Sequence, residues 1–121
     1  MSNIITDLEV EEILDSRGRP TLKVTLVSDE IVASVAVPSG KSTGAREAVE
    51  LRDPDGLGVK QAIKLAMNEI KPALIGLEID QMKIDERLID LDNTVDKSRF
   101  GGNTMIGVSM ATAVLGAKLA D

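Results

Sequence analysis

The chain has 121 residues, which suits one domain with a hydrophobic core. It contains no Cys and no His, so disulfides, thiolate nucleophiles, imidazole acid–base catalysis and Cys/His zinc sites are excluded. A single aromatic residue, a formal net charge of −6 and the lack of any Lys/Arg run argue against binding to nucleic acid or to an anionic membrane surface.

The N-terminal third of the sequence predicts β-strands. Leu22, Val24 and Leu26 alternate with the polar residues Thr21, Lys23 and Thr25, which is the period of a strand with one buried face. The stretch "DSRGRP" contains a Gly and a Pro and is typical of a turn. We expect strands within residues 3–16, 21–29 and 31–37, with a short polar turn at 28–30. Because the connections are short, the strands should form an antiparallel meander.

The remainder of the chain predicts helices. In residues 58–76 apolar side chains recur at helical spacing, at Val59, Ala62, Ile63, Ala66, Met67 and Ile70. Pro72 and Gly76 are expected to end this helix. A second helix is expected over residues 80–92, with Asp80 as its N-cap. Its apolar side should consist of Met82, Ile84, Leu88 and Leu91.

The last predicted helix, over residues 103–121, is rich in small and apolar residues. We expect it to be closely packed and largely buried, with Asn103 or Thr104 capping its start. A helix this apolar usually needs cover on more than one side, so we expect further chain to follow Asp121. Strands followed by helices predict an α+β fold.

The string Gly40-Lys41-Ser42-Thr43 is similar to the end of a nucleotide-binding P-loop. A P-loop also requires Gly at position 35, where this chain has Val35, and Pro38 removes a backbone N–H from the region that should supply donors. Two other interpretations are a flexible loop that joins a strand to a helix and an active-site lid that meets a metal-bound or phosphorylated ligand. Tight, Mg²⁺-dependent ATP binding would identify the P-loop.

Four stretches in a fixed order resemble the enolase family, the glycolytic phosphopyruvate hydratases. They are "DSRGRPT", "VPSGKSTGAREAVELRD", "GVKQAI" and "IDLDNTVDKSRFGGNTMIGVSMATA", and they extend over nearly the whole chain. The resemblance implies the N-terminal domain of an enolase, a three-stranded antiparallel β-meander followed by a helical bundle. Residues 1–121 are therefore expected to form this lid domain, and the catalytic barrel domain is expected to be absent from the chain.

The resemblance also offers an interpretation of the glycine-rich loop. The mobile lid of enolases is matched by Ser39, Gly40, Lys41, Ser42, Thr43 and Gly44. In the family this lid closes over 2-phosphoglycerate and excludes water. Ser39 matches the residue that reaches the second Mg²⁺ ion on closure, and a hard oxygen ligand suits that cation.

The implied function is that of a Mg²⁺-dependent lyase, which dehydrates 2-phosphoglycerate to phosphoenolpyruvate in glycolysis and gluconeogenesis. The family's Lys base, Glu acid and metal-binding carboxylates lie in the barrel, which is also where Mg²⁺ is mainly bound. We therefore expect no catalytic residue in this chain and no activity from the chain alone. The alternatives are a stand-alone, enolase-derived interaction module without catalysis and a small nucleotide-binding protein.

Arg17 resembles the family Arg that pairs with a carboxylate of the partner subunit across a dimer interface. The expected partners are therefore the barrel domain, a second subunit and, through the lid, 2-phosphoglycerate. The alternative for Arg17 is an ordinary surface residue in a turn. Helix surfaces that a barrel would otherwise cover should let the isolated chain form a dimer or a higher oligomer.

The other charged residues are interpreted as structural. Asp15 and Ser16 are expected to form the turn. The cluster Glu47, Glu50, Arg52 and Asp53 is expected to anchor the lid through salt bridges, and Asp90 and Asp92 are expected to end a helix. No apolar stretch is long enough to span a membrane, and the acidic start is unlike a secretory signal, so we expect a cytoplasmic protein.

Overall fold

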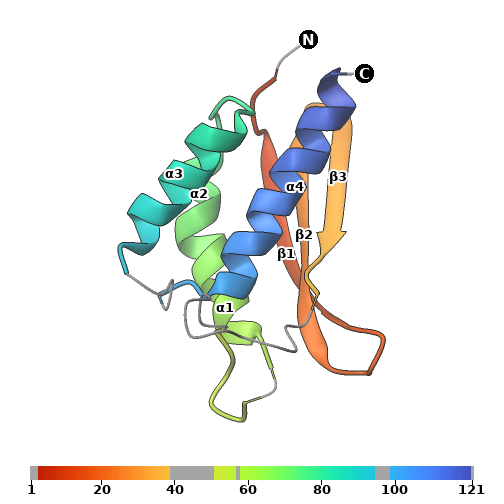
Figure 1. The fold of residues 1–121 in the computed structure, drawn as a ribbon, viewed down its shortest axis with the longest axis vertical. Coiled ribbons are helices and arrows are strands. Elements are labelled where there is room, and N and C mark those ends of the chain that lie inside the picture. Colours follow the sequence, from red (N-terminus) through yellow and green to blue (C-terminus); the bar gives the residue numbers. More distant parts are fainter. Residues whose placement is uncertain (1–2, 39–50, 57, 95–98, 121) are drawn as a thin grey trace.

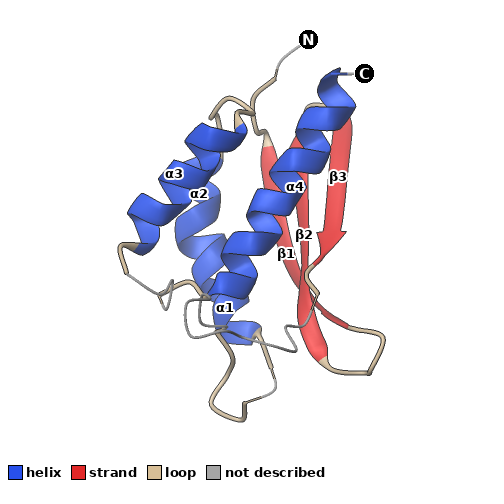
Figure 2. Cartoon of the chain, in the orientation of Figure 1, coloured by secondary structure: helices blue, strands red, loops and turns tan. Residues whose placement is uncertain are grey.

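The fold combines one antiparallel sheet with helices packed on one of its faces (Figures 1 and 2). The computed structural model describes residues 3–38, 51–56, 58–94 and 99–120. The strands are β1 (Asp7–Leu14), β2 (Pro20–Ser28) and β3 (Ile31–Ala36). The helical elements are α1 (Lys60–Leu65), the π-helical η1 (Ala66–Ile70), α2 (Lys71–Leu74), α3 (Gln81–Asp92) and α4 (Gly102–Ala120). This order confirms the predicted α+β class.

The sheet is the predicted meander, with strand order β1-β2-β3 and antiparallel pairing throughout. Leu22, Val24 and Leu26 of β2 are fully buried on the helix-facing side, as their alternation predicts. Thr21 was predicted on the polar side, but only 3% of it is exposed. The hydroxyl of Thr21 donates a hydrogen bond to the carbonyl of Val37 (2.7 Å), which satisfies the buried polar group.

The hydrophobic core lies between the sheet and the helices. Helix α4 packs along β2 and β3, the continuous helical run α1–η1–α2 packs against β1, and α3 packs on α4 (Figure 1). The largest fully buried side chains include Leu8, Leu26, Ile70, Leu88, Phe100 and Leu115. Every layer contributes to this single cluster, so burial of apolar surface holds the whole domain together.

Pro72 does not end the helical run, which corrects the prediction. The run continues from Lys60 to Leu74, and Pro72 lies at the start of α2. Pro72 has no N–H to donate to the carbonyl of Asn68, one turn earlier. The π-helical turn η1 lies directly before α2, where it widens the helix ahead of the ring. The run ends before Gly76, whose φ of +90° suits glycine.

Lys71 connects this helical run to the exposed edge of the sheet. Its Nζ lies 3.1 Å from Oδ1 of Asp7 and 3.6 Å from Oε1 of Glu9, both in β1. The hydrogen bond from Lys71, with a second one from the backbone N–H of Leu8, lowers the pKa of Asp7. The same bond raises the pKa of Lys71. These side chains are partly exposed to solvent, which screens the charges, so the ion pair adds little to stability.

Helix α3 begins as predicted and departs from the prediction at Met82. The side chain of Asp80 accepts a hydrogen bond from the backbone N–H of Lys83, which is the N-cap arrangement. Ile84 and Leu88 are buried, but Met82 is 71% exposed. Met82 therefore does not belong to the apolar side of the helix in this domain.

Helix α4 begins without the cap that its sequence suggests. The side-chain amide of Asn103 bonds to Leu51 instead. The buried hydroxyl of Thr104 has no hydrogen-bond partner among the described residues. The helix is also less buried than predicted, because one stripe along it is exposed. This α4 stripe consists of Ile106, Met110, Ala113, Val114 and Ala117.

In the part of the chain that the structure describes, every helix is too short or too polar to cross a lipid bilayer.

Candidate functional site

The predicted lid residues Ser39, Gly40, Lys41, Ser42, Thr43 and Gly44 lie outside the described residues, as do Glu47 and Glu50. The structure does describe the chain on both sides of them. These flanking residues show how the scaffold holds the two ends of the segment.

The N-terminal flank is held by the start of β2. The backbone N–H of Val37 donates to the carbonyl of Leu22 (2.8 Å), and the carbonyl of Val37 accepts the hydroxyl of Thr21. Val37 itself is 3% exposed and belongs to the core. The chain therefore leaves β3 in a fixed position, and only Pro38 separates this anchor from Ser39.

The C-terminal flank is held by the start of α4. The backbone N–H of Leu51 donates to Oδ1 of Asn103 (3.0 Å), and Nδ2 of Asn103 donates to the carbonyl of Leu51 (3.2 Å). Gly101 makes this close approach possible. Its φ is +92°, and a Cβ there would lie 2.5 Å from Cβ of Leu51, so other residues are excluded by both strain and contact.

Arg52 and Asp53 extend this anchor through hydrogen bonds to backbone groups, whereas the expected salt bridges to Glu47 and Glu50 involve residues outside the described ones. Nη1 of Arg52 donates to the carbonyl of Pro20 (2.5 Å), at the start of β2. The two carboxylate oxygens of Asp53 accept the N–H groups of Lys60 (3.0 Å) and Gln61 (2.9 Å), in the first turn of α1. Both residues thus connect the segment after the lid to backbone groups of rigid elements.

The turn that carries Arg17 lies directly before Pro20, the residue whose carbonyl accepts the side chain of Arg52. Oδ1 of Asp15 accepts the backbone N–H groups of Arg17 and Arg19, each at 2.9 Å. Gly18 has a φ of +76°, which a tight turn needs. Asp15 is therefore a turn-forming residue, as predicted, and Arg17 is exposed at the tip of the turn.

The described residues do not supply a metal site. Residues 3–38, 51–56, 58–94 and 99–120 contain no group of three or more acidic side chains placed to hold a metal ion. Asp92 is buried, but its carboxylate accepts hydrogen bonds from Thr94 and Phe100 and so holds a turn. Asp90 is exposed on the same helix.

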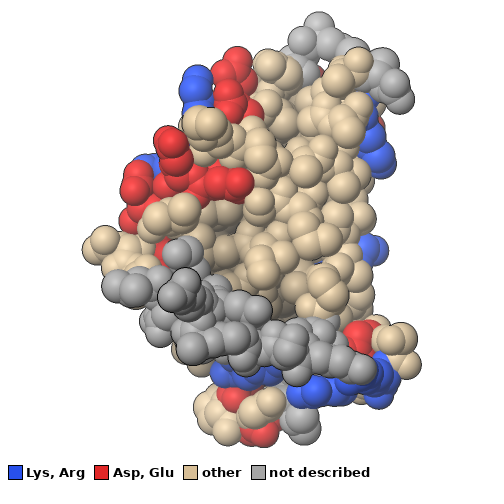
Figure 3. Space-filling view, viewed as in Figure 1, with Lys and Arg blue, Asp and Glu red and all other residues tan. Residues whose placement is uncertain are grey.

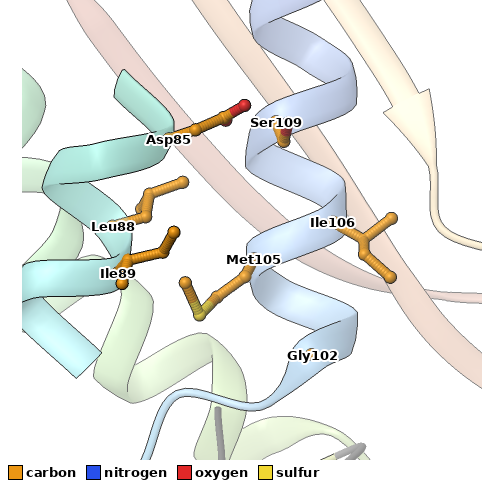
Figure 4. Close-up of a pocket in the computed structure, with 7 residues that line it drawn as sticks. All are labelled: Asp85, Leu88, Ile89, Gly102, Met105, Ile106 and Ser109. Atoms are coloured by element: carbon orange, nitrogen blue, oxygen red, sulfur yellow. The ribbon is translucent and has the colours of Figure 1, made fainter. Parts of the chain in front are cut away.

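A groove of ≈ 240 Å³ lies between α3 and α4 (Figure 4). Its lining is mainly apolar and consists of Asp85, Leu88, Ile89, Gly102, Met105, Ile106 and Ser109. In Figure 4, Met105 extends toward Ile89, whereas Ile106 points away from α3. The groove has few polar groups, so it is suited to contact with another apolar surface and not to binding a phosphorylated metabolite.

Sequence reasoning missed Thr21 and Asn103 as anchors of the two flanks. Thr21 follows the polar positions in the alternation of β2, so the pattern predicts that it lies on the exposed face. Asn103 lies before an apolar helix and so reads as a cap. The partner of Asn103 is 52 residues away in the chain, and only the tertiary structure brings the two together.

Comparisons with known proteins agree with this architecture. The family model described as "Enolase, N-terminal domain" matches residues 5–121. An enolase from Mycobacterium leprae (strain TN) is 52% identical over 124 residues, an alignment that covers 98% of this chain and 29% of the relative. The chain thus spans less than a third of the length of that relative. Because the family model and the similarity both extend over nearly all of these residues, the chain belongs to the enolase N-terminal domain family.

Proposed function

We propose that this chain is the lid-bearing N-terminal domain of an enolase that dehydrates 2-phosphoglycerate to phosphoenolpyruvate. The observation that carries the proposal is the 52% identity to an enolase over 98% of the chain. A second, barrel domain supplies the catalytic residues and most of the Mg²⁺ ligands in this proposal, as the family resemblance implies. The enzyme then works in the cytoplasm as a homodimer.

The proposed contribution of this domain is the segment Ser39 to Gly44. It lies over bound 2-phosphoglycerate, and Ser39 is the residue that reaches the second Mg²⁺ ion. The proposal is supported by the way Val37 and Leu51 are held, because a lid requires fixed ends to return to one position. The exposed turn residue Arg17 is proposed to meet a carboxylate of the second subunit.

The test is an assay of phosphoenolpyruvate formation from 2-phosphoglycerate with Mg²⁺. A longer protein that carries this domain and its barrel should turn over substrate, and residues 1–121 alone should not. Ser39→Ala in the longer protein should lower kcat by at least the roughly 10- to 100-fold that loss of an outer-shell partner of a metal site costs, because Ser39 is proposed to contact the ion itself. Ser34→Ala is the matched control, since Ser34 is exposed on β3 and, among the described residues, its hydroxyl bonds across the sheet to that of Thr25.

Turnover by the 121-residue chain alone would contradict the division of roles between the domains. Full activity of Ser39→Ala would contradict the role of that residue in the lid.

The second candidate is a stand-alone, non-catalytic interaction module, and the observation that favours it is the exposed α4 stripe. The mass of the native protein in its source cells, detected with an antibody to this domain, distinguishes the two. A species several times heavier than this chain supports the enolase, and a species of the same mass supports the module.

A further inference from the structure

Strand β3 forms an outer edge of the sheet, and half of its backbone groups point away from β2. The backbone N–H of Val37 donates to the carbonyl of Leu22, so these two residues form a hydrogen-bonded pair of the antiparallel ladder. Such pairs alternate along a ladder with pairs whose backbone groups point outward. In the register of β2 and β3, the outward positions are Val32, Ser34 and Ala36.

The sequence of β3 does little to prevent this edge from pairing with another strand. The strand reads IVASVA, with neither a charged residue nor a Pro, and its register with β2 runs without a bulge. Val32 is 46% exposed, and Ser34 and Ala36 are exposed as well. Charged residues, Pro, bulges and covering elements are the usual means of protecting an edge, and an apolar edge without them tends to pair with another chain.

Lys118 supplies a charge at this edge from another element. It lies in the last turn of α4, which runs beside β3 and ends near the start of that strand (Figure 1). Its Nζ donates a hydrogen bond to the carbonyl of Val32 (2.6 Å), a residue 86 positions away in the chain. An outward carbonyl of the edge is therefore occupied by an ammonium group.

The same carbonyl is the acceptor that a second copy of the chain would need. Antiparallel pairing of two β3 strands about Ser34 places Val32 of one copy opposite Ala36 of the other, so that the N–H of Ala36 would donate to the carbonyl of Val32. This register sets Glu30 opposite Pro38, so the facing strands bring no like charges together. The ammonium group on α4 would lie at the junction, and burying an unpaired charge there is costly.

We propose that Lys118 protects the edge of β3 from pairing, and that β3 pairs with β3 of a second copy of the chain once the ammonium group is removed. This inference is independent of the proposed function, because it depends on contacts of β2, β3 and α4 alone. It also differs from association through the α4 stripe, which would use side chains of a helix and not the backbone of a strand.

The experiment measures the association of the 121-residue chain by sedimentation velocity. Every protein carries Ile106→Lys, which suppresses contact through the α4 stripe. Lys118→Met removes the charge and the donor and keeps the length of the side chain, and we expect the dissociation constant of the dimer to fall by at least about tenfold relative to the Ile106→Lys parent. Lys64→Met is the matched control, because Lys64 is exposed on α1, which packs against β1.

Two further measurements identify β3 as the contact. In the Lys118→Met dimer, hydrogen exchange at the backbone N–H of Ser34 should slow, because this group then bonds to the second copy. Val32→Lys added to Lys118→Met returns a positive charge to the edge at an exposed position, and it should restore the dissociation constant of the parent. Circular dichroism checks that each protein is folded.

A tighter dimer for Lys118→Met, with slower exchange at Ser34 and reversal by Val32→Lys, supports the protecting role. Equal association of Lys118→Met and the parent overturns it, as does an equal gain in the Lys64→Met control. Association that leaves exchange at Ser34 unchanged, or that Val32→Lys does not reverse, overturns pairing through β3.

Discussion

Two neighbouring residues end α3 by different means. Asp92 is 1% exposed, and its carboxylate accepts hydrogen bonds from the hydroxyl and N–H of Thr94 and from the N–H of Phe100 (2.9 Å). Asn93 has a φ of +54°, the left-handed conformation that Asn tolerates better than most residues with a side chain.

The buried carboxylate of Asp92 should matter for stability. Asp92→Ala leaves the backbone N–H groups of Thr94 and Phe100 without their acceptor, and we expect a loss of about 3 kcal/mol in the free energy of unfolding. Asp90→Ala removes an exposed carboxylate from the same helix and should change stability by less than about 0.5 kcal/mol. Urea unfolding followed by circular dichroism measures both. Equal effects of the two variants would show that the carboxylate of Asp92 does not hold this turn.

At the scale of elements, the packing of α4 on the sheet depends on Gly107. The helix approaches β2 and the residue that follows β3 so closely that a Cβ at this position would lie 2.7 Å from methyl groups of both Val24 and Val37. Gly116 is in the same helix, but among the described residues a Cβ there would meet Cγ2 of Ile79 at an ordinary 3.7 Å. The sequence does not distinguish the two glycines, but the side chains packed against them differ.

This difference gives a matched pair of substitutions. Gly107→Ala should destabilise the domain, because overpacking costs about 1–3 kcal/mol and exceeds the helix propensity that Ala gains over Gly. Gly116→Ala should stabilise it by about 0.5–1 kcal/mol, because Ala favours the helix more than Gly does and meets no steric clash at this position. Thermal unfolding measures both shifts. A stabilising Gly107→Ala would show that α4 can move away from the sheet at little cost.

The helical run from Lys60 to Leu74 shows a limit of local rules. Pro72 was expected to end the helix because it lacks an N–H. The buried side chains of Ala66, Ile70 and Leu74 continue the same apolar face on both sides of that position. Keeping these three side chains in the core favours one widened turn over a break. Tertiary packing thus overrode the local preference.

At the scale of the whole molecule, charge and apolar surface are separated. Figure 3 shows acidic and basic side chains toward the edges of this face, and an uncharged surface where Figure 1 places α4. Ile106 of the α4 stripe is 50% exposed, and Ile89 of the neighbouring α3 is 48% exposed. Contiguous exposed apolar surface on a domain is typical of a surface that contacts another protein or domain.

The isolated chain should therefore self-associate through this surface. Sedimentation velocity at increasing concentration should reveal a dimer or larger species, and Ile106→Lys should shift the chain toward a monomer because it places a charge within the contact. Leu14→Lys is the control, since Leu14 is 66% exposed at the end of β1 and away from α4. A chain that stays monomeric at every concentration would contradict this expectation.

The sequence by itself determined the strands, the order of elements, the cap at Asp80, the turn at Asp15 and the membership in the enolase family. These features depend on short-range periodicity, on local hydrogen bonding and on motifs, and each of these involves residues that are close together in the chain. Only the tertiary structure decided that Asn103 bonds to Leu51, that Thr21 is buried, that a π-turn accommodates Pro72 and that Met82 is exposed. Each of these depends on contacts with residues distant in the chain or on how much of a helix its neighbours cover. The local sequence does not contain information on either.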